Sequence, residues 1–264
     1  MLNQETIDTA RKNGKIGYRI QCLETTDSTN LDIRRAAMEG EAHGLVVTAE
    51  SQLAGRGRRG RNWESVTGQN LYFSLLLLPE VPQENASMIT VAAALAVTEA
   101  IRDIGIDAKI KWPNDVVAEG RKLCGILTEL GWRADGRYFV ILGIGVNVNQ
   151  QIFGEEIRDT ASSLYLQTSV LQEREVLLAQ ILDRFAEVYK AFESCGDLSC
   201  LREAYEALLV NCGQTVRVLD PKGEWTGVAE GINDRGELLV RNQQGTVEAV
   251  YAGEVSVRGI YGYV

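Results

Sequence analysis

The segment Gly55–Arg61 reads Gly-Arg-Gly-Arg-Arg-Gly-Arg, which places four arginines and three glycines within seven residues. Glycines at this density free the backbone and let its amide groups approach a ligand closely. Arginine adds rigid forks that match phosphate or carboxylate oxygens. The segment lacks the Gly-x-x-x-x-Gly-Lys-Ser/Thr pattern, so it is not a phosphate loop of the Walker type. By itself it also fits a solvated basic turn or an RNA-binding tail, but Gln52 and Trp63 flank it and apolar strands hold both ends.

A second segment that could do chemistry is Lys111–Asp115, which reads Lys-Trp-Pro-Asn-Asp. Because Pro113 disfavours helix at the residue before it, the pattern predicts a strand end that bends into a loop. Such a loop presents Asn114 and Asp115 together. The carboxylate could bind Mg²⁺ beside nucleotide phosphates, since Mg²⁺ takes one or two protein oxygens and several waters. The alternative interpretation is ordinary turn chemistry for an Asn-Asp pair.

Two further segments lie within apolar strands. Lys122 opens the strand 121–129 just after a turn, where its ammonium could point at a bound anion, although a lone lysine in such a place is usually a solvated charge. The segment Gly143–Asn149 carries two glycines among β-branched residues, which suggests the close approach of a ligand or of neighbouring backbone. Asn147 could then form a hydrogen bond with that ligand.

The elements that position these segments follow from the hydrophobic pattern. Strands are predicted at 18–24, 45–49, 70–78 and 138–146, and 109–149 reads as strand, turn, strand, with turns at 119–120 and 134–136. Helices are predicted from 27–30 to 39, over 86–104 with Asn85 as its cap, over 173–192 and over 198–209. The segment 213–258 is rich in glycine and β-branched residues, with turns at 221–223, 233–236 and 243–245, which is typical of a small β-barrel. The sequence therefore predicts an α+β main domain followed by a barrel.

Composition excludes several classes of protein. The 264 residues carry a formal net charge of -9, whereas a domain that grips nucleic acid is usually basic. No signal peptide is seen, and apolar runs such as Leu75–Leu78 are far too short to span a membrane. Five scattered cysteines, without a Cys-x-x-Cys pair, predict free thiols in a reducing cytosol and no structural zinc site. The single histidine, His43, lies in a predicted turn and is not expected to be catalytic.

Taken together, the segments resemble biotin protein ligases in their order and spacing, from about residue 18 to the end. The matching segments are Asp27–Asn30, Gln52 with Gly55–Trp63, Lys111–Asp115, Arg121–Leu127 and Gly143–Asn147. The resemblance implies a mixed-sheet catalytic domain of the biotin/lipoate ligase type with a C-terminal SH3-like β-barrel. It divides the chain into a short N-terminal segment (1–17), the catalytic domain (18–210) and the barrel (211–264). The implied enzyme converts biotin and ATP to biotinyl-5'-AMP and pyrophosphate, then transfers biotin to a lysine of a biotin carboxyl carrier protein.

The resemblance also implies roles for single residues, with Lys122 and Arg58 as the catalytic pair. Lys122 matches the lysine that contacts the biotin carboxylate and the mixed anhydride, and Asp115 matches a residue that handles Mg²⁺. The implied biotin-binding residues are Ser28, Thr29, Asn30, Gln52, Arg56, Gly57, Arg58, Trp63, Lys122, Gly125 and Gly143. The implied ATP- and adenylate-binding residues are Arg58, Arg61, Lys111, Asn114, Asp115 and Asn147.

Further expectations concern location and partners. The resemblance implies ATP and Mg²⁺ as requirements and a cytoplasmic enzyme without nucleic-acid or membrane partners, and it allows a homodimer, because relatives often pair through the main sheet. About seventeen residues precede Tyr18, too few for the winged helix-turn-helix of relatives that repress transcription, so we expect no repressor function. One alternative is a lipoate or octanoate ligase or transferase, whose Arg-Arg-x-Ser/Thr-Gly-Gly-Gly pattern is missing. The other is an RNA-binding module.

Overall fold

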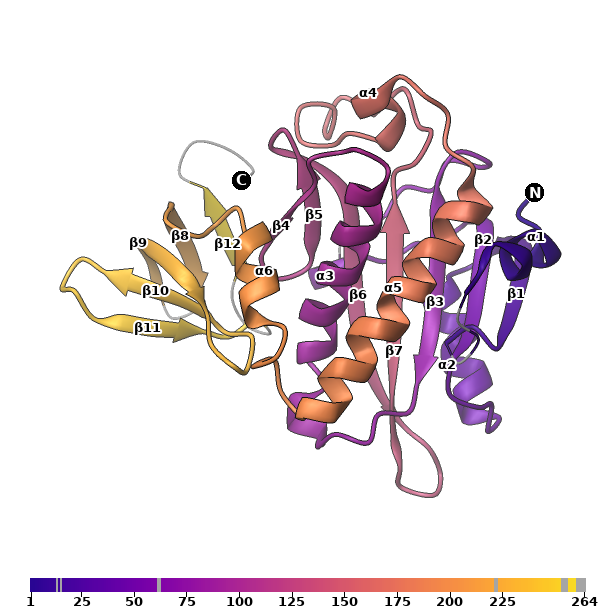
Figure 1. Cartoon of the computed structure of the whole chain (residues 1–264), viewed down its shortest axis with the longest axis horizontal. Helices are drawn as coiled ribbons and strands as arrows, with labels where there is room; N and C mark the ends of the chain where they lie inside the picture. The colour runs from indigo at the N-terminus through magenta and orange to yellow at the C-terminus, as the bar shows by residue number, and fades with distance from the viewer. Residues whose placement is uncertain (13, 15, 61–62, 221–222, 253–255, 260–264) are drawn as a thin grey trace.

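A seven-stranded mixed sheet forms the body of the protein, and a five-stranded antiparallel sheet lies to one side of it (Figure 1). The computed structural model describes residues 1–12, 14, 16–60, 63–220, 223–252 and 256–259. The strand order of the larger sheet is β1-β2-β3-β7-β6-β5-β4, in which β1 and β2 are parallel and the other pairs are antiparallel. Its strands are β1 (Arg19–Thr26), β2 (Leu45–Gln52), β3 (Leu71–Leu77), β4 (Lys109–Lys111), β5 (Asp115–Ala118), β6 (Arg121–Trp132) and β7 (Tyr138–Val146).

The smaller sheet has the order β11-β10-β9-β8-β12, and with the larger sheet it confirms the predicted α+β fold with an SH3-like barrel. Its strands are β8 (Thr215–Asp220), β9 (Gly223–Ile232), β10 (Leu238–Asn242), β11 (Val247–Val250) and β12 (Ser256–Gly259). The helices are α1 (Gln4–Ala10), α2 (Thr29–Met38), α3 (Met88–Asp103), α4 (Leu164–Thr168), α5 (Arg174–Cys195) and α6 (Arg202–Leu208), with short 3-10 turns η1 (Arg58–Gly60) and η2 (Gln83–Asn85).

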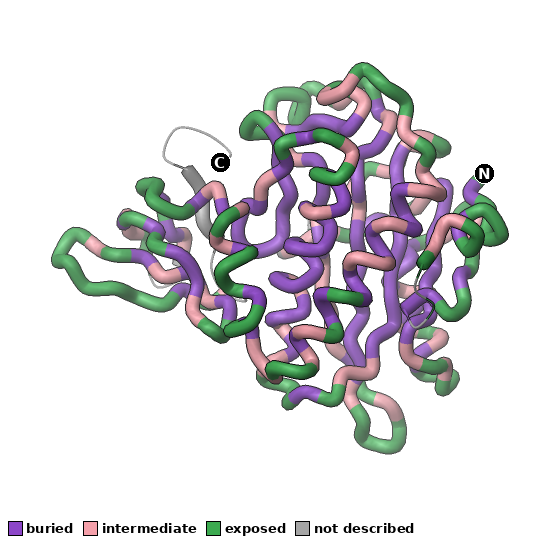
Figure 2. The backbone as a smooth tube through the Cα atoms, in the orientation of Figure 1, coloured by how far each residue is buried: buried purple, intermediate pink, exposed green. Residues whose placement is uncertain are grey.

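Alternating side chains give the larger sheet two different faces. In β2, Val46 packs into the main core with α3 and α5, whereas Leu45 and Val47 pack into a second cluster with Ile33 of α2. Figure 2 shows the central strands buried along most of their length, because helices cover them. The helix α3 is apolar almost all round, since it lies between the sheet and α5. The second face, which α2 covers in part, carries the candidate site.

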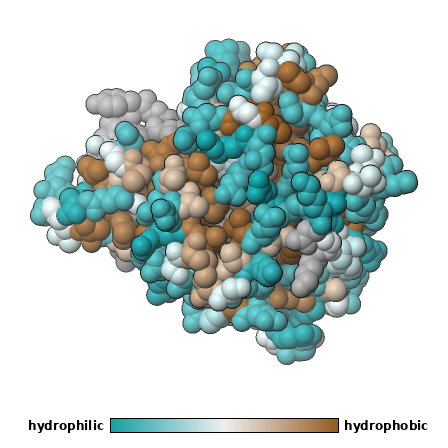
Figure 3. Space-filling model, in the orientation of Figure 1, coloured by the Kyte–Doolittle hydropathy of each residue, from teal (hydrophilic) through white to brown (hydrophobic). Residues whose placement is uncertain are grey.

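The outer surface of the α3 and α5 layer faces solvent. In Figure 3, hydrophilic residues spread over this face with hydrophobic ones interspersed among them. Within the described part of the chain, no helix combines the length and the apolar character that a membrane span requires.

Trp112 joins the two sheets. Its side chain is 1% exposed, and its indole Nε1 donates a hydrogen bond to the Gly236 carbonyl (2.9 Å). Its backbone N–H donates to Asn211 Oδ1 (2.9 Å), and the Trp112–Pro113 peptide bond is cis. A further backbone bond runs from Val210 N–H to the carbonyl of Ile110 (2.9 Å). Buried hydrogen bonds therefore connect the segment around Trp112 to the barrel.

The N-terminal segment packs against the main domain. Leu2, Ile7 and Ile16 are buried, and α1 lies against α5. Nearby, Arg174 makes two hydrogen bonds (2.8 and 3.2 Å) with the carboxylate of Glu50, a pair whose side chains are 10% and 5% exposed. The sequence predicted no helix in this segment.

Most predicted elements are confirmed, with three corrections. Asn85 does not cap the long helix: it ends η2 and its amide donates to the Gly196 carbonyl (2.9 Å), while α3 begins two residues beyond the predicted start. The last predicted helix begins at Arg202 rather than Leu198. The prediction of free thiols is wrong for Cys195 and Cys200, because α5 ends in a left-handed turn at Gly196 that brings the two together as a disulfide. Three cysteines within the described ranges are free: Cys22, Cys124 and Cys212.

Two turns of the barrel, at 233–236 and 243–245, are confirmed by backbone bonds from Gly236 to Asn233 and from Gly245 to Asn242. The predicted turn at 221–223 falls mainly on residues outside the described ranges. The domain boundary at 210–211 stays a prediction and lies between α6 and β8.

Candidate active site

One pocket brings most of the predicted site residues together on the second face of the larger sheet. The start of α2, the loop after β2 and the strands β6 and β7 enclose it. Twelve predicted residues line it: Ser28, Thr29, Asn30, Gln52, Arg56, Gly57, Arg58, Trp63, Asn114, Lys122, Gly125 and Gly143. Five other lining residues were not predicted: Phe73, Ile126, Leu127, Ile144 and Gly145.

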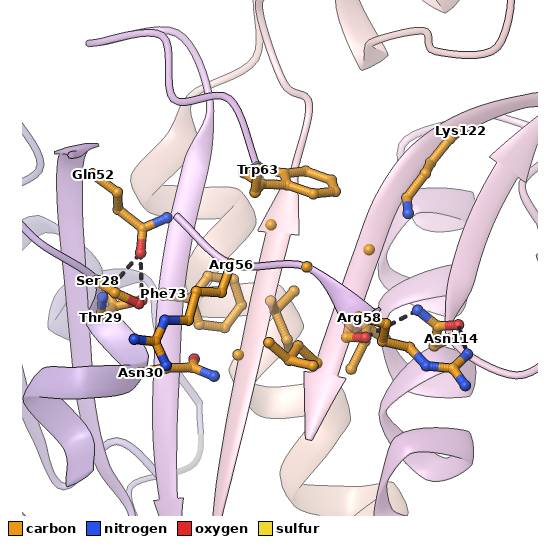
Figure 4. A pocket seen from close by; sticks show the side chains of 17 residues that line it. Ser28, Thr29, Asn30, Gln52, Arg56, Arg58, Trp63, Phe73, Asn114 and Lys122 are labelled. Atoms are coloured by element: carbon orange, nitrogen blue, oxygen red, sulfur yellow. Dashed lines mark hydrogen bonds between the residues drawn. The ribbon is translucent and has the colours of Figure 1, made fainter. Parts of the chain in front are cut away.

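One end of the pocket carries hydroxyl and amide groups from α2 and β2. Gln52 Oε1 accepts a hydrogen bond from the backbone N–H of Thr29 (2.9 Å), so a side chain from β2 caps the first turn of α2. Ser28 is the N-cap residue, yet within the described residues its hydroxyl makes no capping bond to the helix backbone. Figure 4 shows Ser28, Thr29 and Gln52 grouped on one side of the pocket, with the exposed loop residue Arg56 reaching toward them.

Asn30 lies beside this group and explains why Gly143 has no side chain. Its Oδ1 accepts from the hydroxyl of Ser74 (2.6 Å), and its Nδ2 donates to Glu129 (2.8 Å). A Cβ on Gly143 would lie 2.1 Å from Asn30 Oδ1, so any side chain there would collide with the amide. The glycine was expected to admit a ligand or backbone; here it makes room for a side chain.

The other end of the pocket is cationic. Lys122 Nζ lies 2.6 Å from Asp115 Oδ1, and the two side chains are 24% and 13% exposed. Asn114 donates to the same carboxylate oxygen (3.1 Å), and its Oδ1 accepts from Arg58 (2.8 Å). The guanidinium of Arg58 also donates to the carbonyl of Ala252 in the barrel. Two cations and the smaller sheet therefore meet where an anionic group would bind.

Trp63 lies between the two ends (Figure 4). Its backbone N–H donates to the Gly55 carbonyl (3.0 Å), which closes the arginine- and glycine-rich loop on itself. Its indole covers Gly125 and Gly145, which are paired opposite each other on β6 and β7. A Cβ on either glycine would lie 2.7 Å from a ring carbon, so both positions require glycine. The ammonium of Lys122 lies 5.2 Å from the ring centre.

The side chains here do not build a metal site by themselves. The Asp115 carboxylate is already engaged by Lys122 and Asn114. Among the residues that the structure describes, no three His, Cys, Asp or Glu side chains lie close enough together to hold an ion. Because Mg²⁺ takes only one or two protein oxygens beside phosphates and water, the assignment of Asp115 to Mg²⁺ stays a prediction.

Three other predicted residues do not line the pocket: Asp115, Lys111 and Asn147. Lys111 is 6% exposed and lies opposite Asp115 in the β4–β5 register. Asn147 is buried and donates to the carbonyl of Ser162 (3.0 Å), which fixes the loop after β7. Arg61 lies outside the described residues. Their assignment to the nucleotide stays a prediction.

Sequence reasoning missed two supporting residues below the pocket, Ser74 and Glu129. Ser74 is 0% exposed in an otherwise apolar strand, so its pattern reads as core. Gly145 could have been predicted from the sequence, because it lies in the same Gly-x-Gly segment as Gly143.

Comparison with known proteins agrees with this geometry. Residues 21–147 match the biotin/lipoate A/B protein ligase family, and residues 212–258 match the biotin protein ligase C-terminal domain. The bifunctional ligase/repressor BirA of Bacillus spizizenii is 32% identical over 259 residues, which covers 97% of this chain and 79% of that protein. The biotin–[acetyl-CoA-carboxylase] ligase of Paracoccus denitrificans is 32% identical and covers 90% of this chain and 100% of its own length.

A solved structure is similar over nearly the whole chain. The biotin protein ligase of Aquifex aeolicus, in complex with biotin and ATP, has a TM-score of 0.80 and 33% identity, covering 91% of this chain and 99% of that one. The two family matches, over residues 21–147 and 212–258, include the segments that form the pocket and most of both sheets. On these grounds, the chain belongs to the biotin protein ligase family.

Proposed function

We propose that this protein is a biotin–[acetyl-CoA-carboxylase] ligase that binds biotin and ATP in the pocket described above. The observation that carries the proposal is the polarity of the pocket. Hydroxyl and amide groups lie at one end, the cations Lys122 and Arg58 at the other, and Trp63 over bare glycine backbone between them. This arrangement suits biotin, whose ureido ring, apolar tail and carboxylate follow the same order.

The first reaction joins the biotin carboxylate to the α-phosphorus of ATP and releases pyrophosphate. Two anions must approach each other, and Lys122 and Arg58 reduce their repulsion and stabilise the charge that develops in the transition state. Lys122 is held beside the carboxylate end by Asp115, and Arg58 is held by Asn114 and the barrel. The loop that ends at Trp63 covers the ligand and keeps water from hydrolysing the adenylate.

In the second reaction, a lysine amine of the acceptor protein attacks the biotinyl carbonyl of the mixed anhydride. An amide bond forms, the bond to phosphate breaks, and AMP leaves with the electron pair, while the amine loses a proton. The acceptor is proposed to be a biotin carboxyl carrier protein, which supplies the lysine.

Mg²⁺ is proposed to enter with ATP, bound by phosphate oxygens and water, with Asp115 as the protein residue that would share it. A cytoplasmic location belongs to the same proposal, because ATP is the co-substrate there. A homodimer through the edge strand β1 is a further part of the proposal, and light scattering of the purified protein tests it.

The test combines calorimetry with exchange of labelled pyrophosphate into ATP. We expect biotin to bind and exchange to depend on biotin, because adenylation is reversible. Lipoate is expected to give neither signal. Exchange that depends on lipoate instead would assign the chain to lipoate ligases, and no response to either acid would overturn the proposed function.

A further inference from the structure

The hydrogen bonds below the pocket form a continuous chain. It runs from Glu129 to Asn30 (2.8 Å), Ser74 (2.6 Å) and Thr29 (2.7 Å), and Arg34 forms an ion pair with Glu129 (3.7 Å) outside this chain. Thr29 and Asn30 line the pocket, whereas Ser74 and Glu129 are not among its lining residues. We propose that Glu129 and Ser74 are positioning residues that fix the direction of the Thr29 hydroxyl proton, and thereby make Thr29 a hydrogen-bond acceptor toward the ligand. This inference rests on the proposed function.

The direction of each bond follows from the chemistry of the groups. An ionised carboxylate only accepts hydrogen bonds, so Glu129 requires the NH₂ of Asn30 to face it. The amide oxygen of Asn30 must then face Ser74, and it also can only accept. The single proton of Ser74 is therefore committed to Asn30 at 2.6 Å.

The hydrogen bond between Thr29 and Ser74 also has a defined direction. Two hydroxyl oxygens 2.7 Å apart need a proton between them, and Ser74 has none left to give. Thr29 must therefore donate its proton to Ser74, at 2.7 Å, rather than to Gln52 Oε1, which is farther away at 3.2 Å. What remains on Thr29 for the pocket is a lone pair.

The strand register supports the chain. Ser74 lies directly opposite Gly143, the glycine over which Asn30 packs. Asn30 is thus enclosed by Ser74, Glu129 and a position without a side chain, and its amide has a fixed orientation. The pocket then selects a ring with an N–H group at the place that Thr29 faces.

The experiment compares biotin with two cyclic-carbamate analogues in which one or the other ring N–H is replaced by oxygen. The ratio of each analogue's Kd to that of biotin is measured by calorimetry. In the unaltered protein, we expect one analogue to bind at least about tenfold more weakly than biotin, since a lone pair then faces a lone pair. The other analogue serves as an internal reference.

In Ser74→Ala, the Thr29 proton is released and can point toward the ligand. We expect biotin to bind about tenfold more weakly and the ratio for the sensitive analogue to fall toward one. A merely structural role would weaken all three ligands equally and leave the ratio unchanged. Glu129→Ala is expected to move the ratio in the same direction, and it carries the test if Ser74→Ala fails to fold.

Arg34→Ala is the matched control, because it removes the ion pair with Glu129 without touching Asn30. It is expected to change neither the biotin Kd nor the ratio by more than about twofold. A ratio that stays the same in both Ser74→Ala and Glu129→Ala would overturn the inference while leaving the proposed function intact. Failure of the unaltered protein to bind biotin would overturn both.

Discussion

Lys122 Nζ lies 2.6 Å from Asp115 Oδ1, so the ammonium at the cationic end of the pocket is held in place by the protein itself. The pair joins the start of β6 to the start of β5, two neighbouring strands of one hairpin. An incoming carboxylate can take the ammonium as a second partner without any movement of the backbone. The position of Lys122 is therefore established before the ligand arrives.

Replacement of Lys122 by alanine should slow adenylation strongly. It removes a cation that stabilises the transition state, and such contacts contribute about 10²–10³ in rate. Biotin-dependent pyrophosphate exchange measures the effect. Lys109→Ala on β4 of the same sheet is the control, since Lys109 pairs with the exposed Asp107 and lies outside the pocket lining. Equal rates for the two variants would contradict the role of Lys122.

Gly145→Ala should weaken biotin binding with little loss of stability. The new methyl group would lie 2.7 Å from the Trp63 ring, so the indole must move away from the strand pair. We expect the Kd for biotin to rise by at least about tenfold, the cost of losing one well-packed side-chain contact over the ligand. Calorimetry measures it. Gly154→Ala, where an added Cβ meets nothing within 4 Å, should leave the Kd unchanged.

Arg174→Ala should destabilise the fold. It leaves the buried carboxylate of Glu50 with the more distant N-terminal ammonium (3.8 Å) in place of its close guanidinium partner, and breaking a buried pair costs up to about 3–5 kcal/mol. Urea unfolding followed by fluorescence gives the free energy of unfolding. Arg184→Ala breaks an exposed pair with Asp103 and is expected to cost less than about 1 kcal/mol. Similar losses in the two variants would show that burial of the Arg174–Glu50 pair does not increase its contribution to the free energy of unfolding.

His43 should make the stability depend on pH. Its Nδ1 accepts from the backbone N–H of Leu78 (3.0 Å), its ring stacks on Tyr189, and burial lowers its pKa below the ordinary value of 6.5 despite the nearby Glu193 and Glu80. As the pH falls through 6.5, the unfolded chain binds a proton before the folded one does. The free energy of unfolding should therefore fall by up to about 1.4 kcal/mol per pH unit until the folded pKa is reached.

The measurement is urea unfolding at a series of pH values between 7.5 and 5.5. The sequence contains a single histidine, so His43→Gln removes the titration while an amide oxygen can still accept from Leu78. The variant should lose less stability than the unaltered protein over this range. Parallel curves would show that the pKa of His43 is not lowered.

The sequence predicted the strands and the pocket residues well because both follow from local patterns. The apolar run 70–78 forms a central strand: it pairs with β2 and β7 along its two edges, while α3 and α5 cover one face and α2 covers part of the other. The glycines and arginines of Gly55–Arg61 stand out against an acidic chain, and motif order placed Lys122 and Gln52 in one site.

What the sequence could not predict depends on three-dimensional contacts. Ser74 looks like any polar residue in a buried strand until Asn30 and Thr29 are seen beside it. Asn85 has the chemistry of a helix cap, but the carbonyl of Gly196, far along the chain, takes its amide. The disulfide between Cys195 and Cys200 depends on the turn that ends α5 rather than on a recognisable spacing.

Trp112 has a consequence for how the protein unfolds. Its two N–H groups have their acceptors in Asn211 and Gly236, so removing the barrel would break both hydrogen bonds, at about 0.5–1.5 kcal/mol each, and expose the apolar indole to water. Trp112 is also adjacent in the chain to the hairpin that carries Asn114 and Asp115. The main domain and the barrel should therefore unfold together as one cooperative unit. A chain truncated before the barrel would lose the geometry of the hairpin that carries Asn114 and Asp115, even if the barrel contacts no substrate.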